Sequence, residues 1–446
     1  MRVSLQSVLL LLGALSAQAS AYTSLEYQQQ TFVRSPGLHV GTRFSRGEEP
    51  EDNVSSYRVP LLTLHRALVN VSSISDSEGE VGLLLERLLK DLNYTVELQP
   101  VPPSEAGQGP DDRPTRYNVL AWPGRNASRT LDKRTIITSH IDVVPPYIPY
   151  AIDNKTVPPS EAVDFAALPP TALISGRGSV DAKASVAAQI TATNALLSEG
   201  AISPDSLVLL YVVGEENSGS GMKHFSDSLS NTSAYPVRPQ FRTAIFGEPT
   251  ENKLACGHKG VTGGTVSAVG KAGHSGYPWL GKSAIHVLIR ALDRLLEEDL
   301  GSSERYGNTT VNVGLIEGGV AANVIAPAAS ARVFARVAVG NQTTGGQIVA
   351  ERIKKVIKDV DSEALQVDIT AGVGPVECEC EVDGFETVVA NYGTDIPNLK
   401  GDHVKYLYGP GSILVAHGDD EGLQIKDLED SVEGYKRLIK HAVGSS

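Results

Sequence analysis

The spacing of apolar residues follows two different patterns in two parts of the chain. Up to about residue 258, helical spacing at 61–68 and 81–89 is followed by short apolar runs at 117–121, 135–138, 207–213 and 243–246. An alanine-rich segment at 183–197 has the composition of a helix. Continuous apolar runs are typical of strands that are buried on both faces of a mostly parallel sheet. This order of elements predicts an α/β fold with helices flanking the sheet.

A different pattern begins near residue 260. Strand-like segments at 261–269, 310–316, 331–339 and 365–369 alternate with amphipathic helical segments at 283–299 and 347–360. Strand, helix, strand, strand, helix, strand is the split βαβ plan, and it predicts an inserted α+β, ferredoxin-like lid domain. A strand-like run at 412–416 and a helical segment at 425–441 then have the same pattern as the residues before 258. We therefore expect a catalytic domain at 58–258 and 373–446 that is interrupted by a lid or dimerisation domain at 259–372.

The N-terminal segment predicts export. Arg2 precedes an apolar run at 8–15, and Ala17-Gln18-Ala19 has the small-x-small form of a cleavage site. The run is too short for a membrane span, so residues 1–19 indicate a signal peptide, with an N-terminal anchor as the alternative. Residues 20–57 form a polar leader without periodicity. No later stretch approaches the ~20 apolar residues that a membrane helix requires, so we expect no membrane partner.

Sequons and cysteines agree with an extracellular setting. Asn-x-Ser/Thr occurs at eight positions, a density that predicts a secreted glycoprotein: Asn53, Asn70, Asn93, Asn126, Asn154, Asn231, Asn308 and Asn341. In an oxidising compartment, Cys256 would pair with either Cys378 or Cys380 and leave one thiol. Zinc binding by Cys378 and Cys380 is the alternative, although no second cysteine pair exists to complete such a site.

Charge excludes one class of function. The 39 Lys and Arg against 52 Asp and Glu give a formal net charge of −13. A nucleic-acid binder needs a basic face that neutralises phosphates, so we expect no nucleic-acid partner.

Histidines and carboxylates follow several predicted strands. His140 and Asp142 come after the 135–139 run, Glu215 and Glu216 after the 207–213 run, and Glu248 after the 243–246 run. Sheets of α/β proteins place their sites at the carboxyl ends of their strands, so we expect these side chains to gather. Each position alone is equally compatible with an ordinary polar strand end.

Two further positions extend this set. Asp181 lies in a glycine-flanked loop ahead of the alanine-rich segment, where its carboxylate would either cap the helix or bridge two ions. His417 follows the strand-like 412–416 run. Two histidines and three carboxylates without cysteine suit a divalent ion such as zinc, and two ions about 3.5–4 Å apart can hold a hydroxide and polarise a carbonyl together.

In this order the motifs closely resemble the di-zinc metallopeptidase family of aminoacylase, acetylornithine deacetylase, succinyl-diaminopimelate desuccinylase and glutamate carboxypeptidase. The resemblance runs from about residue 58 to the C-terminus and includes the lid, where Gly-Lys-Ala-Gly-His274-Ser, Asn323 and Arg336 match the family's lid residues. Ala184 departs from the glycine that often follows the lysine of the Asp181 loop. The resemblance implies two zinc ions per subunit, with Asp181 bridging both. His140 and Glu248 would complete one site, and Glu216 and His417 the other.

The resemblance also implies catalytic roles. Asp142 would orient His140, and Glu215 would be the general base that takes a proton from the bridging water and passes it to the leaving amine. His274 would help to stabilise the oxyanion, and Asn323 and Arg336 would contact the substrate. Members of the family commonly form homodimers through the lid.

Three readings of the activity follow. Since a secreted enzyme meets peptides, we expect a zinc-dependent metallopeptidase, an exopeptidase of carboxypeptidase type. An N-acyl-amino-acid hydrolase would use the same catalytic residues, so the sequence leaves both peptide and N-acyl amino acid as substrates. A catalytically inactive binding protein on the same fold is disfavoured because no ligand position or base is substituted.

Overall fold

The computed structural model describes residues 55–102, 115–231 and 237–444, all within one compact unit, Val54–Ser446. The predicted signal peptide at 1–19, most of the leader at 20–57 and the sequon at Asn53 lie outside the described residues.

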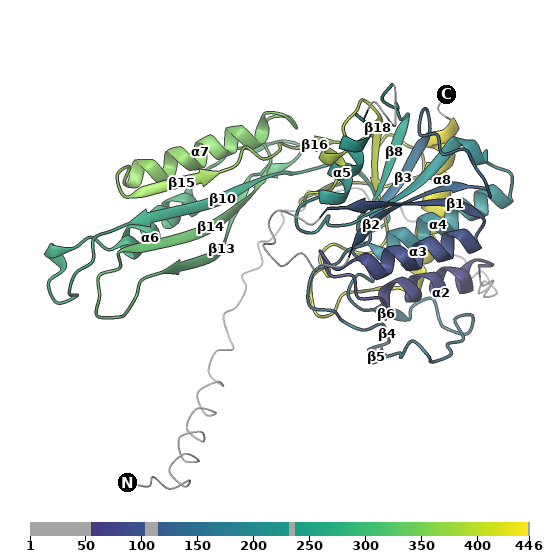
Figure 1. Ribbon diagram of the computed structural model, residues 1–446, viewed down its shortest axis with the longest axis horizontal. Helices are drawn as coiled ribbons and strands as arrows, with labels where there is room; N and C mark the ends of the chain where they lie inside the picture. Colours follow the sequence, from purple (N-terminus) through teal and green to yellow (C-terminus); the bar gives the residue numbers. More distant parts are fainter. Residues whose placement is uncertain (1–54, 103–114, 232–236, 445–446) are drawn as a thin grey trace, which may run out of the picture. The chain divides into compact units, whose positions relative to one another are not determined.

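A six-stranded sheet forms the centre of the fold (Figure 1). Its strands lie in the order β1 (Tyr94–Val101), β2 (Arg116–Pro123), β7 (Leu207–Val212), β3 (Thr135–His140), β8 (Thr243–Gly247) and β18 (Val404–Tyr408). The last four strands of this order run parallel, whereas β2 is antiparallel to both of its neighbours. The four predicted runs are all strands, and the predicted mostly parallel sheet is confirmed.

Both faces of the sheet are covered, which explains why its strands are continuously apolar. Along β7, Leu207, Leu209 and Tyr211 join the core that is shared with α2 (Arg58–Val69), α3 (Gly79–Asp91), α4 (Lys183–Ser198) and α8 (Ile425–Gly444). Val208 and Leu210 point the other way and share a core with α5 (Ser220–Ser228). A small four-stranded sheet lies beside this body: β19 (Gly422–Gln424), β6 (Leu173–Ser175), β4 (Ala151–Ile152) and β5 (Lys155–Thr156).

Residues 260–369, here called the inserted domain, have their own sheet and core. Its four antiparallel strands lie in the order β13 (Thr310–Gly318), β14 (Ala328–Val337), β10 (Gly260–Val269) and β15 (Leu365–Ile369). The helices α6 (Ala284–Glu297) and α7 (Gly345–Val360) run along one face of this sheet (Figure 1). Leu288, Val333 and Ile353 belong to the core between the two layers. All six predicted elements are present in the predicted order.

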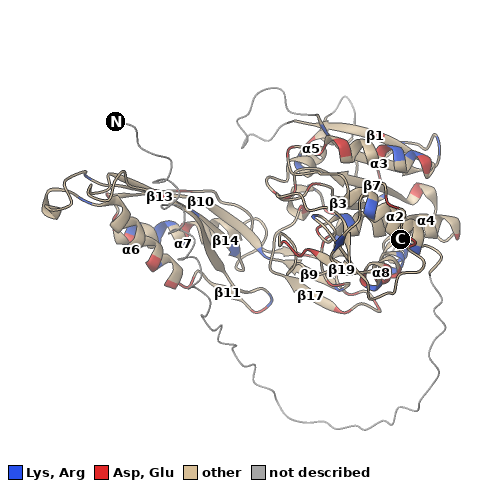
Figure 2. Ribbon diagram, turned by 90° about the horizontal axis from the view of Figure 1, so that it is seen from below, with Lys and Arg blue, Asp and Glu red and all other residues tan. Residues whose placement is uncertain are grey.

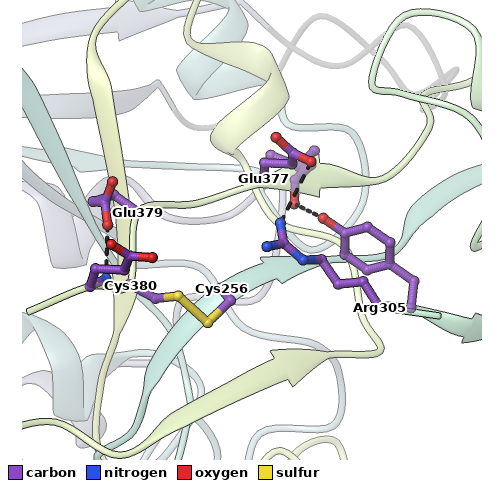
Figure 3. The surroundings of a disulfide bond; sticks show 8 residues. Cys256, Arg305, Glu377, Glu379 and Cys380 are labelled. Carbon is purple, nitrogen blue, oxygen red and sulfur yellow. Dashed lines mark hydrogen bonds and ion pairs between the residues drawn. A yellow bond between two sulfur atoms is a disulfide. The ribbon is translucent and has the colours of Figure 1, made fainter. Parts of the chain in front are cut away.

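A small sheet and a disulfide join the two chain segments that flank the inserted domain. β9 (Leu254–His258) lies between β16 (Val376–Glu377) and β17 (Thr387–Ala390). Cys256 on β9 is bonded to Cys380 (Figure 3). Cys378 is a buried free thiol. Pairing of Cys256 with one of the other two cysteines is therefore confirmed, and the alternative zinc site at Cys378 and Cys380 is wrong because the sulfur of Cys380 is bonded to that of Cys256.

The predicted strand at 412–416 is wrong. Ser412 forms only an isolated bridge with Thr250, residues 413–416 form consecutive turns, and Leu414 is 86% exposed. The four apolar residues in a row resemble a buried strand, but they lack a partner strand that would bury them. The strand that completes this side of the sheet is β18, which lies earlier in the chain and was not predicted.

Charges are mixed over the described surface. Along α3 and α6, Lys and Arg are interspersed with Asp and Glu, whereas α7 carries four basic and two acidic residues (Figure 2). Among the described residues, none of the helices combines the length and the apolar character needed to cross a bilayer.

Candidate metal centre and active site

The carboxyl ends of β3 and β8 bring a histidine and a carboxylate together. His140 is the last residue of β3 and Glu248 follows β8; both are buried. The Nε2 atom of His140 lies 3.8 Å from Oε2 of Glu248. Its Nδ1 donates a hydrogen bond to the backbone oxygen of Asp142 at 3.0 Å, which leaves Nε2 facing the site.

Asp181 stands between two groups of candidate ligands. Its Oδ1 lies 3.0 Å from Nε2 of His140, and its Oδ2 lies 3.4 Å from Nε2 of His417. His417 is also 2.9 Å from Oε2 of Glu216. Two sets of ligand atoms therefore each lie within 4.8 Å of one another and share Asp181: His140, Asp181 and Glu248, and Asp181, Glu216 and His417. The five positions that the sequence singled out for metal meet at this place.

Asp181 is not a helix cap. The N-cap residue of α4 is Ala182, whose methyl group accepts no hydrogen bond. The backbone N–H groups of Val180 and Asp181 instead donate to Oε1 of Glu421, at 3.0 and 3.1 Å. The other oxygen of Glu421 accepts from Arg177 at 2.8 Å, and both side chains are buried. Glu421 therefore fixes the loop that presents Asp181, a role that the sequence did not indicate.

Asp142 positions the two glutamates that follow β7. Its Oδ1 accepts from the backbone N–H of Glu215 at 3.1 Å, and its Oδ2 accepts from that of Glu216 at 3.2 Å. The hydroxyl of Ser75 donates to the same Oδ2 at 2.8 Å. Asp142 thus contacts His140 through its backbone oxygen and holds the glutamate pair through its carboxylate.

Burial and mutual repulsion act on the carboxylates of this site. Burial, followed by the negative charge of Glu248, raises the pKa of Glu215 well above its usual value. Burial also raises the pKa of Glu216, with a further contribution from Asp181, and raises the pKa of Glu248 to about 7. Burial opposes ionisation of Asp181 too, but hydrogen bonds from His140 and His417 outweigh it and lower the pKa of this carboxyl. The site therefore concentrates more negative charge than its surroundings can solvate.

The histidines offset part of that charge. Burial opposes protonation of His140, but the charge of Glu248 and the hydrogen bond with Asp181 outweigh it and raise the pKa of this imidazole well above its usual value. Hydrogen bonds with Asp181 and Glu216 raise the pKa of His417 to about 10. Oε1 of Glu216 is buried without a hydrogen-bond partner in the described part of the chain. Crowded carboxylates, imidazole nitrogens that face them and an unpartnered oxygen are typical of a divalent metal site, so the two ligand groups fit divalent metal ions.

A pocket of about 530 Å³ opens over this centre. Glu215 and the candidate ligands Asp181, Glu216, Glu248 and His417 line it, and Arg336 of β14 faces the same space. Burial lowers the pKa of Arg336, and the charge of Glu215 opposes that effect. The pocket therefore contains a cation that can receive an anionic group next to the candidate general base.

Asp395 is a pocket residue that the sequence did not indicate. Its side chain is 4% exposed, one oxygen accepts from Asn398 at 2.6 Å, and the other is buried without a partner among the described residues. It lies in a loop after β17, away from any strand end that the pattern marked.

Two predicted lid residues lie elsewhere. His274 is exposed and forms an isolated bridge with Val324, and the N–H of Ser275 donates to the backbone oxygen of Asn323 at 3.0 Å. His274 and Asn323 are thus neighbours, but neither is among the described residues that line the pocket. The structure brings Arg336 to the candidate centre and leaves this pair outside it.

Comparison with known proteins shows the family. Residues 256–368 match the model of the peptidase dimerisation domain. A peptidase M20 domain-containing protein of Sordaria macrospora is 55% identical over 403 residues, which cover 89% of this chain and 87% of that protein. The chain belongs to the peptidase M20 family. The resemblance that the motifs predicted is confirmed, and so, at the level of the family, is a hydrolase of the peptidase class.

Other members of the M20 family extend the comparison. A probable carboxypeptidase of Uncinocarpus reesii is 45% identical, with 86% of this chain and 87% of that protein covered. A solved tripeptidase from Staphylococcus aureus matches with a TM-score of 0.65 at 19% identity, over 87% of this chain and 99% of that one. An M20 family metallo-carboxypeptidase from Sulfolobus solfataricus matches with a TM-score of 0.60 at 17% identity, over 86% and 99%. These structural matches confirm the predicted fold.

Proposed function

We propose that this M20 peptidase is a zinc-dependent exopeptidase of carboxypeptidase type. The observation that carries the proposal is the sharing of Asp181 by two ligand groups beside Glu215, in a pocket that also contains Arg336. The name of the Uncinocarpus reesii relative, probable carboxypeptidase, supports the same activity.

The residues divide the work as follows. His140, Asp181, Glu216, Glu248 and His417 would hold two zinc ions, which would supply Lewis acidity and lower the pKa of a bound water. The backbone N–H of Glu215 donates to Asp142, and this hydrogen bond holds Glu215 beside the ligand Glu216. The carboxylate of Glu215 accepts the proton of the attacking water and delivers it to the leaving nitrogen. Arg336 binds the carboxylate of the C-terminal residue, which fixes the scissile amide in register with the centre.

Two copies of the chain complete this site. Residues 256–368 resemble a dimerisation domain, and His274 and Asn323 are neighbours that do not line the pocket of their own chain. We infer that the enzyme is a homodimer in which these two residues serve the oxyanion and the substrate of the partner's pocket.

The enzyme acts outside the cell. The proposal rests on the apolar N-terminal segment with its small-x-small site and on the sequons. Among the described residues, Asn70 is partly buried. The other six sequon asparagines are exposed: Asn93, Asn126, Asn154, Asn231, Asn308 and Asn341. Glycans at these positions would meet solvent.

One assay tests the activity. The purified enzyme is incubated with N-blocked dipeptides and, in parallel, with N-acetyl amino acids, each with and without a chelator. We expect release of the C-terminal residue that stops with chelator and returns with added zinc. Faster hydrolysis of N-acetyl amino acids would favour the N-acyl-amino-acid hydrolase, and chelator-insensitive hydrolysis would refute the mechanism.

A further inference from the structure

The free face of the inserted sheet carries three side chains in a row. On β14, Arg332 and Phe334 are exposed and Arg336 is half-buried, whereas Val333 and Ala335 between them are buried under the helices. Residues two apart on a strand point to the same face, so the two guanidinium groups flank the phenyl ring of Phe334. The guanidinium carbon of Arg336 lies 5.0 Å from the centre of that ring.

A groove of about 430 Å³ lies against this row. Three glycines contribute to its floor, Gly263 and Gly264 on β10 and Gly314 on β13, so part of this floor is bare backbone; Val261, Thr262 and Thr370 also line the groove. Gly263 pairs in register with Phe334, and a Cβ at Gly263 would lie 3.1 Å from the ring. The ring therefore rests on bare backbone and forms an apolar wall of the groove.

The groove continues the pocket of the candidate metal centre. Val261, Phe334 and Gly372 line both spaces. Arg336 lines the pocket on one side of the ring, and Arg332 lines the groove on the other. A residue whose α-carboxylate is bound by Arg336 thus has the groove as the adjoining space for its side chain.

We propose that this groove is the specificity pocket for the C-terminal residue and that it selects large apolar or aromatic side chains. The inference rests on the proposed function, which places the substrate carboxylate on Arg336. Phe334 supplies an aromatic face for such a side chain, and the glycine floor leaves room for it. Arg332 stands at the exposed rim, where an ion pair with an acidic side chain would contribute little.

The first test is a substrate series. Blocked dipeptides that share their first residue and end in Ala, Leu, Phe or Glu are compared by kcat/KM. We expect Leu and Phe to exceed Ala by at least about tenfold, since burying a large apolar side chain has that effect. Similar values for all four, or a preference for Glu that Arg332→Met removes, would overturn the inference. Hydrolysis of none of them would overturn the proposed function and this inference together.

The second test fills the groove. A Cβ at Gly314 meets only the side chain of Asn312, at 3.5 Å, so the Cβ of Gly314→Leu is accommodated and the rest of the side chain adds bulk at the groove. We expect this variant to lower the ratio of kcat/KM for Phe over Ala by about tenfold or more. Glu317→Leu, which adds the same apolar bulk at an exposed position of the same strand outside the groove, is the matched control and should keep the wild-type ratio. An unchanged ratio in Gly314→Leu would also overturn the inference.

Discussion

A single buried glutamate determines where Asp181 lies. Glu421 accepts from the backbone N–H groups of Val180 and Asp181 and forms a buried ion pair with Arg177. Removing one member of a buried ion pair leaves the other charge without compensation and costs about 3–5 kcal/mol. Groups that orient metal ligands also change metal affinity, by about 10- to 100-fold. Glu421 should therefore affect both the stability of the fold and the binding of zinc.

We expect Glu421→Gln to lower the melting temperature and to weaken zinc binding by at least about tenfold. Glu429→Gln provides a matched control, because Glu429 forms a similarly buried pair with Arg58 outside the candidate metal centre. It should destabilise the fold but keep the zinc affinity. Thermal unfolding and competition with a chromogenic chelator measure the two effects. Equal zinc affinity in both variants would show that Glu421 has no specific role at the centre.

The sequence could indicate ligand positions but not the residues that support them. His140, Glu216 and Glu248 follow apolar runs, and a polar residue at the end of a buried strand is conspicuous. Glu421 follows Asp419 and Asp420, so it resembles part of a solvated acidic run. Its partner Arg177 lies more than 200 residues earlier, and nothing in the local pattern connects the two.

At the scale of elements, the turn after β7 controls the glutamate pair. Gly214 has a φ of +72°, and a Cβ there would lie 2.5 Å from Oγ of Ser220 and 2.9 Å from a nitrogen of Arg116. A side chain at this position would be strained and would also push the turn that places Glu215 and Glu216.

We expect Gly214→Ala to destabilise the fold by about 1–3 kcal/mol, with a loss of activity. Gly200→Ala separates strain from contact, because Gly200 has a similar φ of +66° and nothing within 4 Å of its Cβ position. This control should cost about 1 kcal/mol and keep full activity. Denaturant unfolding measures the difference in the free energy of unfolding between the two variants. If both variants cost the same, the close approach at Gly214 is unimportant.

Helices and strands with a clear periodicity of apolar residues could be predicted from the sequence, and those without such a periodicity could not. The helices α6 and α7 of the inserted domain have one apolar face each, and their strands alternate or are continuously apolar, so the order of the six elements follows from the sequence. The strand predicted at 412–416 is wrong because a run of four apolar residues fits either a strand or a series of turns. Only the pairing of β18 with β8 decides which segment completes the sheet, and that pairing joins residues about 160 positions apart.

At the scale of the whole molecule, the net charge of −13 includes carboxylates that zinc would offset. Raised folded-state pKa values favour the protonated forms of Glu248 and His417. Each group stabilises the ion-free fold below its unfolded pKa and loses that contribution as the pH rises through its folded pKa. The stabilising contribution is lost between about pH 4.5 and pH 7 for Glu248 and between about pH 6.5 and pH 10 for His417. The lowered pKa of Asp181 affects the stability of the fold only at a pH below both of these intervals.

We therefore expect Glu248 and His417 to remove thermal stability from chelator-treated enzyme between about pH 5 and pH 8, and zinc to restore more stability at the higher pH. His65, His258 and His403 have the opposite effect, because burial lowers their pKa values to about 4. Glu248→Gln, which does not titrate, should lose less stability over the same interval. Melting temperatures with and without zinc measure both effects. Equal changes in stability in the wild-type enzyme and in Glu248→Gln would contradict the proposed arrangement of charges.

The most direct test of the proposed catalytic centre compares two adjacent glutamates by metal content and turnover. We expect Glu215→Gln to retain two zinc ions per subunit and to lose activity by about 10²–10⁴-fold, as the loss of a general base does. Glu216→Gln should lose zinc, because Glu216 belongs to a ligand group. Loss of zinc from Glu215→Gln together with full zinc content in Glu216→Gln would reverse the two roles and contradict the proposed mechanism.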